Sequence, residues 1–419
     1  MYDFMEYCLR CYYRSSGWNE ENQYSNLCSW SRTLLDFYTP RGLSLHLAKL
    51  PTSQFKPSYT MNALPSLNGS IGYLFTSDPL DIGTSGTVDF QDMVDQFRIQ
   101  QSLPSLTTPS APELATIKED TAFAPAKKNY LVYGRMFFPG AALESMYVRR
   151  LSPRLQYLIT AVNHPRESGL PQMAFQLQYD VGKWCSECSY TTDDGLLGIR
   201  ALYNFGKPLE EGHGQWSLGT EVYYGTLDKS GGLSTGLRYR TNPTSTSTPI
   251  NVTYTLNPIV GHMATAYVAQ VSENLTMCSR FEFSIYSYES DLALGFEYRT
   301  KNANLTSSSS TAPPPLTSSS THLSSSSSTT KGKKNKGEPS KNQSHIEPSR
   351  ETDVASSRAP STTKKLEGLM KVRLGFASGL ALMWEGRYKN TLISLGLTAD
   401  LMNPSNPIRT MGIEMQFFS

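Results

Sequence analysis

The feature of this chain that most constrains its fold is an alternation of apolar and polar residues. Because successive side chains of a strand point to opposite faces, such a pattern predicts a strand with one apolar and one polar face. The same alternation recurs at 280–285, 291–299 and 412–417. In its clearest instance the apolar positions are Met173, Phe175, Leu177, Tyr179 and Val181.

Extending this reading from residue 42 to the C-terminus predicts about nineteen strands. Most are roughly ten residues long, the length that a tilted strand needs to cross a bilayer. The predicted strands lie at 42–50, 55–63, 67–76, 129–138, 141–151, 153–163, 171–182, 184–192, 196–205, 215–225, 232–241, 249–257, 260–271, 274–286, 290–299, 366–377, 379–388, 391–401 and 409–417.

So many strands in one open sheet would leave exposed edges, which closure into a barrel removes. The polar face carries Arg, Glu, Gln and Asp, which suit a wet lumen, whereas the other face is rich in Leu, Phe and Tyr. Mean hydropathy is −0.38, but this value does not exclude a membrane barrel, since half of its strand residues face inward. We therefore predict an all-β, transmembrane antiparallel β-barrel of the porin type. A soluble multi-bladed β protein is the alternative.

The predicted organisation has an N-terminal segment, 1–41, followed by the barrel at 42–419. An amphipathic helix is expected between Tyr24 and Phe37, where Leu27, Trp30, Leu34 and Leu35 have helical spacing. Two segments interrupt the barrel: a loop at 77–128, and a Ser/Thr-rich insertion at 301–365 that we expect to be disordered. The basic run from Lys331 to Lys336 is expected to be a solvated part of this insertion.

Neither composition nor motifs predict an enzyme, a cofactor or a metal site. Cys185 and Cys188 lie three apart on a predicted strand, hence on opposite faces, so incidental thiols are favoured over a zinc site shared with Cys8 and Cys11. The Gly-x-Ser-x-Gly pattern around Ser234 lacks the helix that a nucleophile elbow requires. The histidines show no metal-ligand spacing.

The net charge and the N-terminal residues disfavour nucleic-acid-binding and secreted classes of protein. The net charge of +2 predicts no nucleic-acid partner. The N-terminus has neither the apolar core of a secretory signal nor the acid-poor character of a mitochondrial presequence. The six cysteines form no dense framework, which favours a reducing or disulfide-indifferent compartment.

The C-terminal residues 410–417 read polar, any, Gly, any, any, hydrophobic, any, hydrophobic. This order resembles the β-signal by which mitochondrial outer-membrane barrels are recognised and inserted. An ordinary last strand is the alternative, and Ser394 to Leu401 fits the pattern more loosely. The residues that would carry the signal are Thr410, Gly412, Met415 and Phe417.

Four stretches resemble the fungal mitochondrial distribution and morphology protein 10 family: Leu34–Leu43, Gly69–Phe75, Pro139–Arg150 and Tyr286–Ser290. The resemblance spans nearly the whole chain except the Ser-rich insertion. It implies a nineteen-stranded multi-pass barrel of the mitochondrial outer membrane, with the N-terminal helix in the lumen.

The resemblance also implies partners beyond membrane lipids. One is the ER–mitochondria encounter structure, a tether linked to phospholipid exchange and to mitochondrial morphology and inheritance. The other is the sorting and assembly machinery for β-barrels, with the import translocase barrel. Because aromatic side chains make good interface anchors, we expect Tyr73 and Phe75 on the tether side and Phe296 and Tyr298 on the assembly side. The alternative is that all four belong to a lipid-facing girdle.

A channel, either a metabolite porin or a protein-conducting pore, is the competing function. The expected lumen mixes Glu221, Glu282 and Glu297 with Arg238, Arg240 and Arg299, which predicts no strong ion preference. A third possibility, a soluble carbohydrate- or peptide-binding β protein, requires that alkaline carbonate extract the chain from membranes.

Overall fold

The computed structural model describes residues 4–80, 82–88, 90–94, 129–165, 171–206, 214–241, 248–302, 365–401 and 407–419. Most of the predicted loop at 77–128, and the insertion at 301–365 apart from its ends, lie outside these residues. Within the described residues, no helix is both long enough and apolar enough to cross a membrane.

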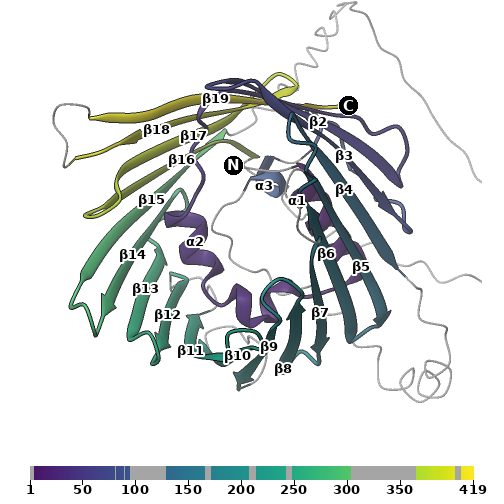
Figure 1. The fold of residues 1–419 in the computed structure, drawn as a ribbon. Coiled ribbons are helices and arrows are strands. Elements are labelled where there is room, and N and C mark those ends of the chain that lie inside the picture. The colour runs from purple at the N-terminus through teal and green to yellow at the C-terminus, as the bar shows by residue number, and fades with distance from the viewer. Residues whose placement is uncertain are drawn as a thin grey trace, which may run out of the picture. The chain divides into compact units, whose positions relative to one another are not determined.

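Nineteen strands are described, and they close into one barrel (Figure 1). This confirms the predicted barrel, and the strand positions agree closely with the alternation in the sequence. The strands are β1 Gly42–Ala48, β2 Phe55–Leu64, β3 Asn68–Thr76, β4 Tyr130–Phe138, β5 Leu143–Ser152, β6 Leu155–Asn163, β7 Gln172–Asp180, β8 Trp184–Thr191, β9 Leu196–Phe205, β10 Gly214–Gly225, β11 Ser230–Thr241, β12 Ile250–Asn257, β13 His262–Gln270, β14 Leu275–Ser284, β15 Ser290–Asn302, β16 Lys365–Gly375, β17 Gly379–Tyr388, β18 Thr391–Ala399 and β19 Ile408–Phe418.

The closing pair, β1 with β19, is parallel, which corrects the expectation of a wholly antiparallel barrel. Neighbouring strands of the meander alternate in direction, so with an odd number the first and the last strand run the same way. Gly42 lies opposite Gly412, and Leu45 lies opposite Met415. The parallel seam is therefore a consequence of the strand count.

The barrel has an exposed apolar exterior and a buried polar interior. On the outer face Leu177 is 46% exposed and Ile199 is 60% exposed. On the inner face Glu297 and Ser217 are both fully buried. This distribution is the reverse of that in a soluble protein, where Leu and Ile are buried and Glu is exposed.

The N-terminal segment forms two helices inside the barrel, α1 Phe4–Ser16 and α2 Ser29–Leu35, joined by 3-10 turns at Glu20–Asn22 and Tyr24–Asn26 (Figure 1). The predicted helix is therefore present but shorter than 24–37. The sequence reading missed α1, although its buried positions have the helical spacing that would have indicated it. These positions are Phe4, Tyr7, Cys8 and Tyr12.

One part of the inner wall is apolar, which differs from the wet lumen expected all around. Helix α1 packs there against Leu74, Leu131 and Val148, all fully buried. Leu80, Ile82, Val88 and Val94 belong to the same cluster, as do Phe90 and Met93 of the short helix α3 Phe90–Met93. Backbone hydrogen bonding holds this segment, since the Ser85 amide donates to the Phe418 carbonyl at 2.9 Å. A long insertion thus contributes part of the interior core.

Candidate functional site

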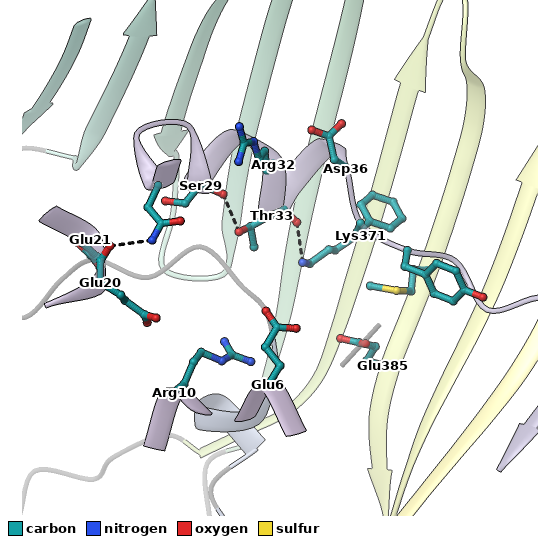
Figure 2. Close-up of a pocket in the computed structure, with 14 residues that line it drawn as sticks. Glu6, Arg10, Glu20, Glu21, Ser29, Arg32, Thr33, Asp36, Lys371 and Glu385 are labelled. Atoms are coloured by element: carbon teal, nitrogen blue, oxygen red, sulfur yellow. Dashed lines mark hydrogen bonds between the residues drawn. The ribbon is translucent and has the colours of Figure 1, made fainter. Parts of the chain in front are cut away.

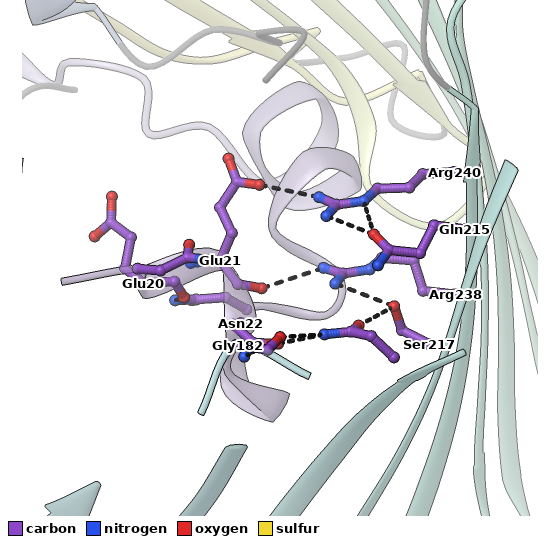
Figure 3. A network of polar contacts seen from close by, with 11 residues as sticks. Glu20, Glu21, Asn22, Gly182, Gln215, Ser217, Arg238 and Arg240 are labelled. Carbon is purple, nitrogen blue, oxygen red and sulfur yellow. Dashed lines mark hydrogen bonds and ion pairs between the residues drawn. The ribbon is translucent and has the colours of Figure 1, made fainter. Parts of the chain in front are cut away.

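The candidate site is the lumen, where polar contacts bind the N-terminal segment to the barrel wall (Figure 3). Asn22, only 3% exposed, donates to Asp180 Oδ1 at 2.6 Å. Its own Oδ1 accepts from Asn204 Nδ2, also at 2.6 Å, and the Asn204 Oδ1 in turn accepts from Ser217. Since a buried amide left unpaired is costly, this chain of bonds fixes the turn before α2 against β9 and β10.

Glu21 extends this network to β11. Its carboxylate pairs with Arg240 at 3.2 Å, while its backbone carbonyl accepts from Arg238 at 3.5 Å (Figure 3). Arg240 also donates to Gln215 at 2.8 Å. Arg238 and Arg240 of the inner wall thus bind the segment as well as lining the lumen, and Gln215 holds Arg240 in place.

The C-terminal end of α2 meets three cations of the barrel wall. Lys371 Nζ donates to the Thr33 carbonyl at 2.7 Å, and Arg373 donates to the Leu35 carbonyl at 3.0 Å. The last carbonyls of a helix lack partners within the helix and carry its negative dipole end, so these donors satisfy and stabilise it. The Arg280 guanidinium donates two hydrogen bonds to the Asp36 carboxylate, at 2.7 and 2.9 Å.

Glycines of the inner wall make room for the N-terminal segment. A Cβ built on Gly219 would lie 2.4 Å from the Tyr24 ring, and one on Gly412 would lie 2.6 Å from the Pro40 backbone. Gly396, which pairs with Gly412 across β18 and β19, is equally close to the Pro40 ring. Any larger residue would collide with the segment here, so barrel and segment are matched in shape.

A cavity of about 420 Å³ remains between α1, α2 and strands β16 and β17 (Figure 2). It is lined by acidic and basic side chains together, including Glu6, Arg10, Arg32 and Glu385. Burial raises the pKa of the Glu20 carboxyl, an effect that nearby Arg10 partly offsets. The charges that line this cavity are therefore of both signs.

The four predicted β-signal residues all lie on β19, where they divide between the two faces. Gly412 is buried and Thr410 shares its inward face, while Met415 and Phe417 are exposed on the outer face. A glycine is therefore required at position 412 for packing, because the chain that enters β1 passes too close to leave room for a side chain. The two apolar positions present side chains to the surroundings of the barrel.

The four predicted partner residues lie on the outer face of two strands. Tyr73 and Tyr298 are about half exposed, whereas Phe75 and Phe296 are partly buried. β3 carries the first pair and β15 the second, and several strands separate them in the barrel. The Tyr73 ring covers Gly134, its cross-strand partner on β4, so it also has a structural role.

The structure also places the remaining chemical candidates. Cys185 is buried and Cys188 exposed, as their spacing on one strand predicts. Ser234 lies in the middle of β11, and its hydroxyl accepts from the Tyr24 hydroxyl at 2.9 Å. Among the described residues, no three His, Cys, Asp or Glu side chains gather in a way that could hold a metal ion.

Comparison with known proteins identifies the family. The model of the family described as "Mitochondrial distribution and morphology protein 10" matches residues 1–419. Proteins of that name from Postia placenta and Laccaria bicolor are 35% and 33% identical, with 100% of both chains covered in each case. One from Sclerotinia sclerotiorum is 33% identical over 100% of both chains. The chain therefore belongs to the mitochondrial distribution and morphology protein 10 family.

Proposed function

We propose that this chain is a structural and assembly subunit of the mitochondrial outer membrane that serves mitochondrial distribution and morphology. In this role it anchors the ER–mitochondria encounter structure and joins the sorting and assembly machinery, which inserts other barrels including that of the import translocase. It carries out no catalysis of its own. The observation that carries the proposal is a barrel with an apolar exterior whose lumen is occupied by its own N-terminal segment.

The exterior supports a membrane location. Large apolar side chains such as Leu177, Ile199 and Leu218 are each 46–60% exposed, and such residues recur on strands around the barrel. Continuous exposed apolar surface is costly in water and favourable in hydrocarbon. Each strand has a neighbour on both sides, so the barrel has no open sheet edge, as lipid surroundings require.

The occupied lumen supports an anchoring role over transport. The segment is bound through Asn22, Glu21 and Asp36 and packs through the fully buried Leu34 and Leu35. Clearing a path would require breaking these contacts together. A barrel that is filled in this way offers partners its outer surface and its loops.

The test is co-purification from mitochondria in gentle detergent, followed by mass spectrometry of the partners. We expect Tyr73→Ala with Phe75→Ala to reduce recovery of the tether subunits, and Phe296→Ala with Tyr298→Ala to reduce recovery of the assembly machinery. The matched control is Tyr203→Ala with Phe205→Ala, an exposed Tyr and Phe at the same spacing on β9. Equal loss of both complexes in all three variants, or loss of the barrel itself, would contradict the assignment of these residues.

A channel is the second candidate function, and the polar cavity of about 420 Å³ in the lumen is the observation that favours it. Planar-bilayer recording of the purified full chain distinguishes the two. The anchoring role predicts small, unselective conductance. A large, stable and ion-selective conductance would establish the channel instead.

A further inference from the structure

A second cavity, of about 290 Å³, lies at one rim of the barrel and has a distinct chemistry. Its charged lining comes from Arg41, Arg373, Arg409 and Asp400, so cations outnumber the anion by three to one. Ser378, Tyr38 and three threonines contribute the hydroxyl-bearing side chains of the lining.

The topology explains why these groups meet. β1 and β19 run parallel and begin at the same rim, where β18 ends and β16 turns into β17. Arg41 directly precedes β1, Arg409 is the second residue of β19, and Arg373 lies near the end of β16. Residues far apart in the sequence are therefore brought to one place by the closure of the barrel.

Much of the donor capacity of these arginines is unused. Within the described residues, the side chains of Arg41 and Arg409 form no hydrogen bond and no ion pair. Arg373 donates once, to the Leu35 carbonyl, but its Nε is buried with no acceptor among those same residues. A buried donor without a partner is costly, and among these arginines that cost falls on the Arg373 Nε. An anion in the cavity would give this Nε an acceptor and would pair with the exposed guanidinium groups of Arg41 and Arg409.

We propose that this rim cavity binds a phosphate group. Guanidinium groups present planar pairs of N–H donors that match the oxygens of phosphate, and the Ser378 hydroxyl adds a further donor, whereas Thr398 and Thr410 hydrogen-bond to each other. The group could come from the head of an anionic phospholipid or from free inorganic phosphate, and both present the same oxygens. Only the lipid source depends on the proposed membrane function.

The test uses the purified full chain, refolded in neutral detergent, and the double variant Arg41→Gln with Arg409→Gln. Arg154→Gln is the matched control, because Arg154 is an exposed turn residue outside the cavity. Isothermal titration with inorganic phosphate forms one arm. Native mass spectrometry of lipid retained from phosphatidylcholine nanodiscs doped with phosphatidic acid forms the other. The urea midpoint of each variant checks that the barrel is folded.

Removing one charged contact to an anion weakens binding by about tenfold or more. We expect at least this loss in the double variant, with Arg154→Gln unchanged. Arginine-dependent binding in the phosphate arm supports a site for soluble phosphate, and in the nanodisc arm alone it supports a lipid site. If neither arm shows binding that the double variant weakens, the proposal is wrong. Because inorganic phosphate needs no membrane, binding in the phosphate arm would support the site even if the chain proves to have another cellular function.

Discussion

At the scale of single residues, the inner wall shows how shape and polarity together hold the N-terminal segment. Gly412 is important both in the sequence pattern and in the packing. In the sequence it is the glycine of a predicted insertion signal, and in the structure it is the point where the Pro40 backbone crosses the last strand. Its partner Gly396 has the same closeness to Pro40 but belongs to the looser match at Ser394 to Leu401, not to the C-terminal one. Comparing the two glycines therefore separates packing from recognition of the C-terminal signal.

We expect Gly396→Ala and Gly412→Ala to destabilise the refolded barrel by similar amounts, about 1–3 kcal/mol, because each added methyl group would overlap the Pro40 segment. Urea unfolding in detergent measures the effect. Gly368→Ala is the control, since a Cβ there would make only contacts of 3.6 Å or more. A defect in Gly412→Ala alone, seen only during assembly in mitochondria, would mean that recognition is its sole role.

A second prediction concerns Asn22. Asn22→Ala removes the partner of both Asp180 and Asn204, so we expect the segment to lose about 1–3 kcal/mol of docking free energy. Hydrogen exchange of residues 18–28 should then be faster. Asn68→Ala, which breaks an exposed bond of 2.6 Å to Asn62, should leave that exchange unchanged. Unaltered exchange in Asn22→Ala would refute the role of the network.

At the scale of elements, helix α2 is held by charge at its C-terminal end. The Arg280–Asp36 pair is partly exposed, so we expect a coupling of about 0.5–1 kcal/mol. Arg280→Asp and Asp36→Arg should each loosen α2, and their combination should restore part of the loss. A double-mutant cycle on the urea midpoint measures this. Strictly additive losses would show that the pair contributes nothing.

The docking of the whole N-terminal segment should depend on pH through Glu20. Burial raises its pKa above the usual 4.5, so the docked state favours the protonated carboxyl. Docking is then most stable below about pH 4.5 and weakens as pH rises through the raised pKa. Hydrogen exchange of residues 18–28, corrected for intrinsic rates, should show this trend. Glu20→Gln should dock more tightly at neutral pH and lose the trend, and a trend that persists in Glu20→Gln would exclude Glu20 as its cause.

The strands were predictable from sequence and the helices only in part, for physical reasons. An alternation such as that from Met173 to Val181 arises because the two faces of a strand meet different environments, one apolar and one polar. It can therefore be recognised in the sequence alone. The spacing of Phe4, Tyr7, Cys8 and Tyr12 would have indicated a helix but was missed, and the apolar surface that buries this helix comes from β3–β5 and from residues such as Leu80 and Ile82. No local pattern in the sequence reports such a distant partner.

At the scale of the whole molecule, closure of the barrel accounts for features that no single strand shows. The parallel seam follows from the odd strand count, which the alternation had already indicated, and the rim cavity forms where closure brings Arg41 and Arg409 into one lining. The proposed β-signal residues and partner residues were chosen by their residue type and by their position on a predicted strand. Their faces could be inferred from alternation, but the crossing of Pro40 over Gly412 needed the assembled barrel.

The central claim is that the apolar face of each strand meets lipid while the polar face encloses the lumen. Single nitroxide labels placed at successive positions 174–179 of β7, in protein reconstituted into phosphatidylcholine vesicles, test it most directly. We predict that labels at 175, 177 and 179 collide with oxygen dissolved in the bilayer and that labels at 174, 176 and 178 do not. Equal accessibility at all six positions, or a preference for a water-soluble relaxant at 175, 177 and 179, would contradict the account.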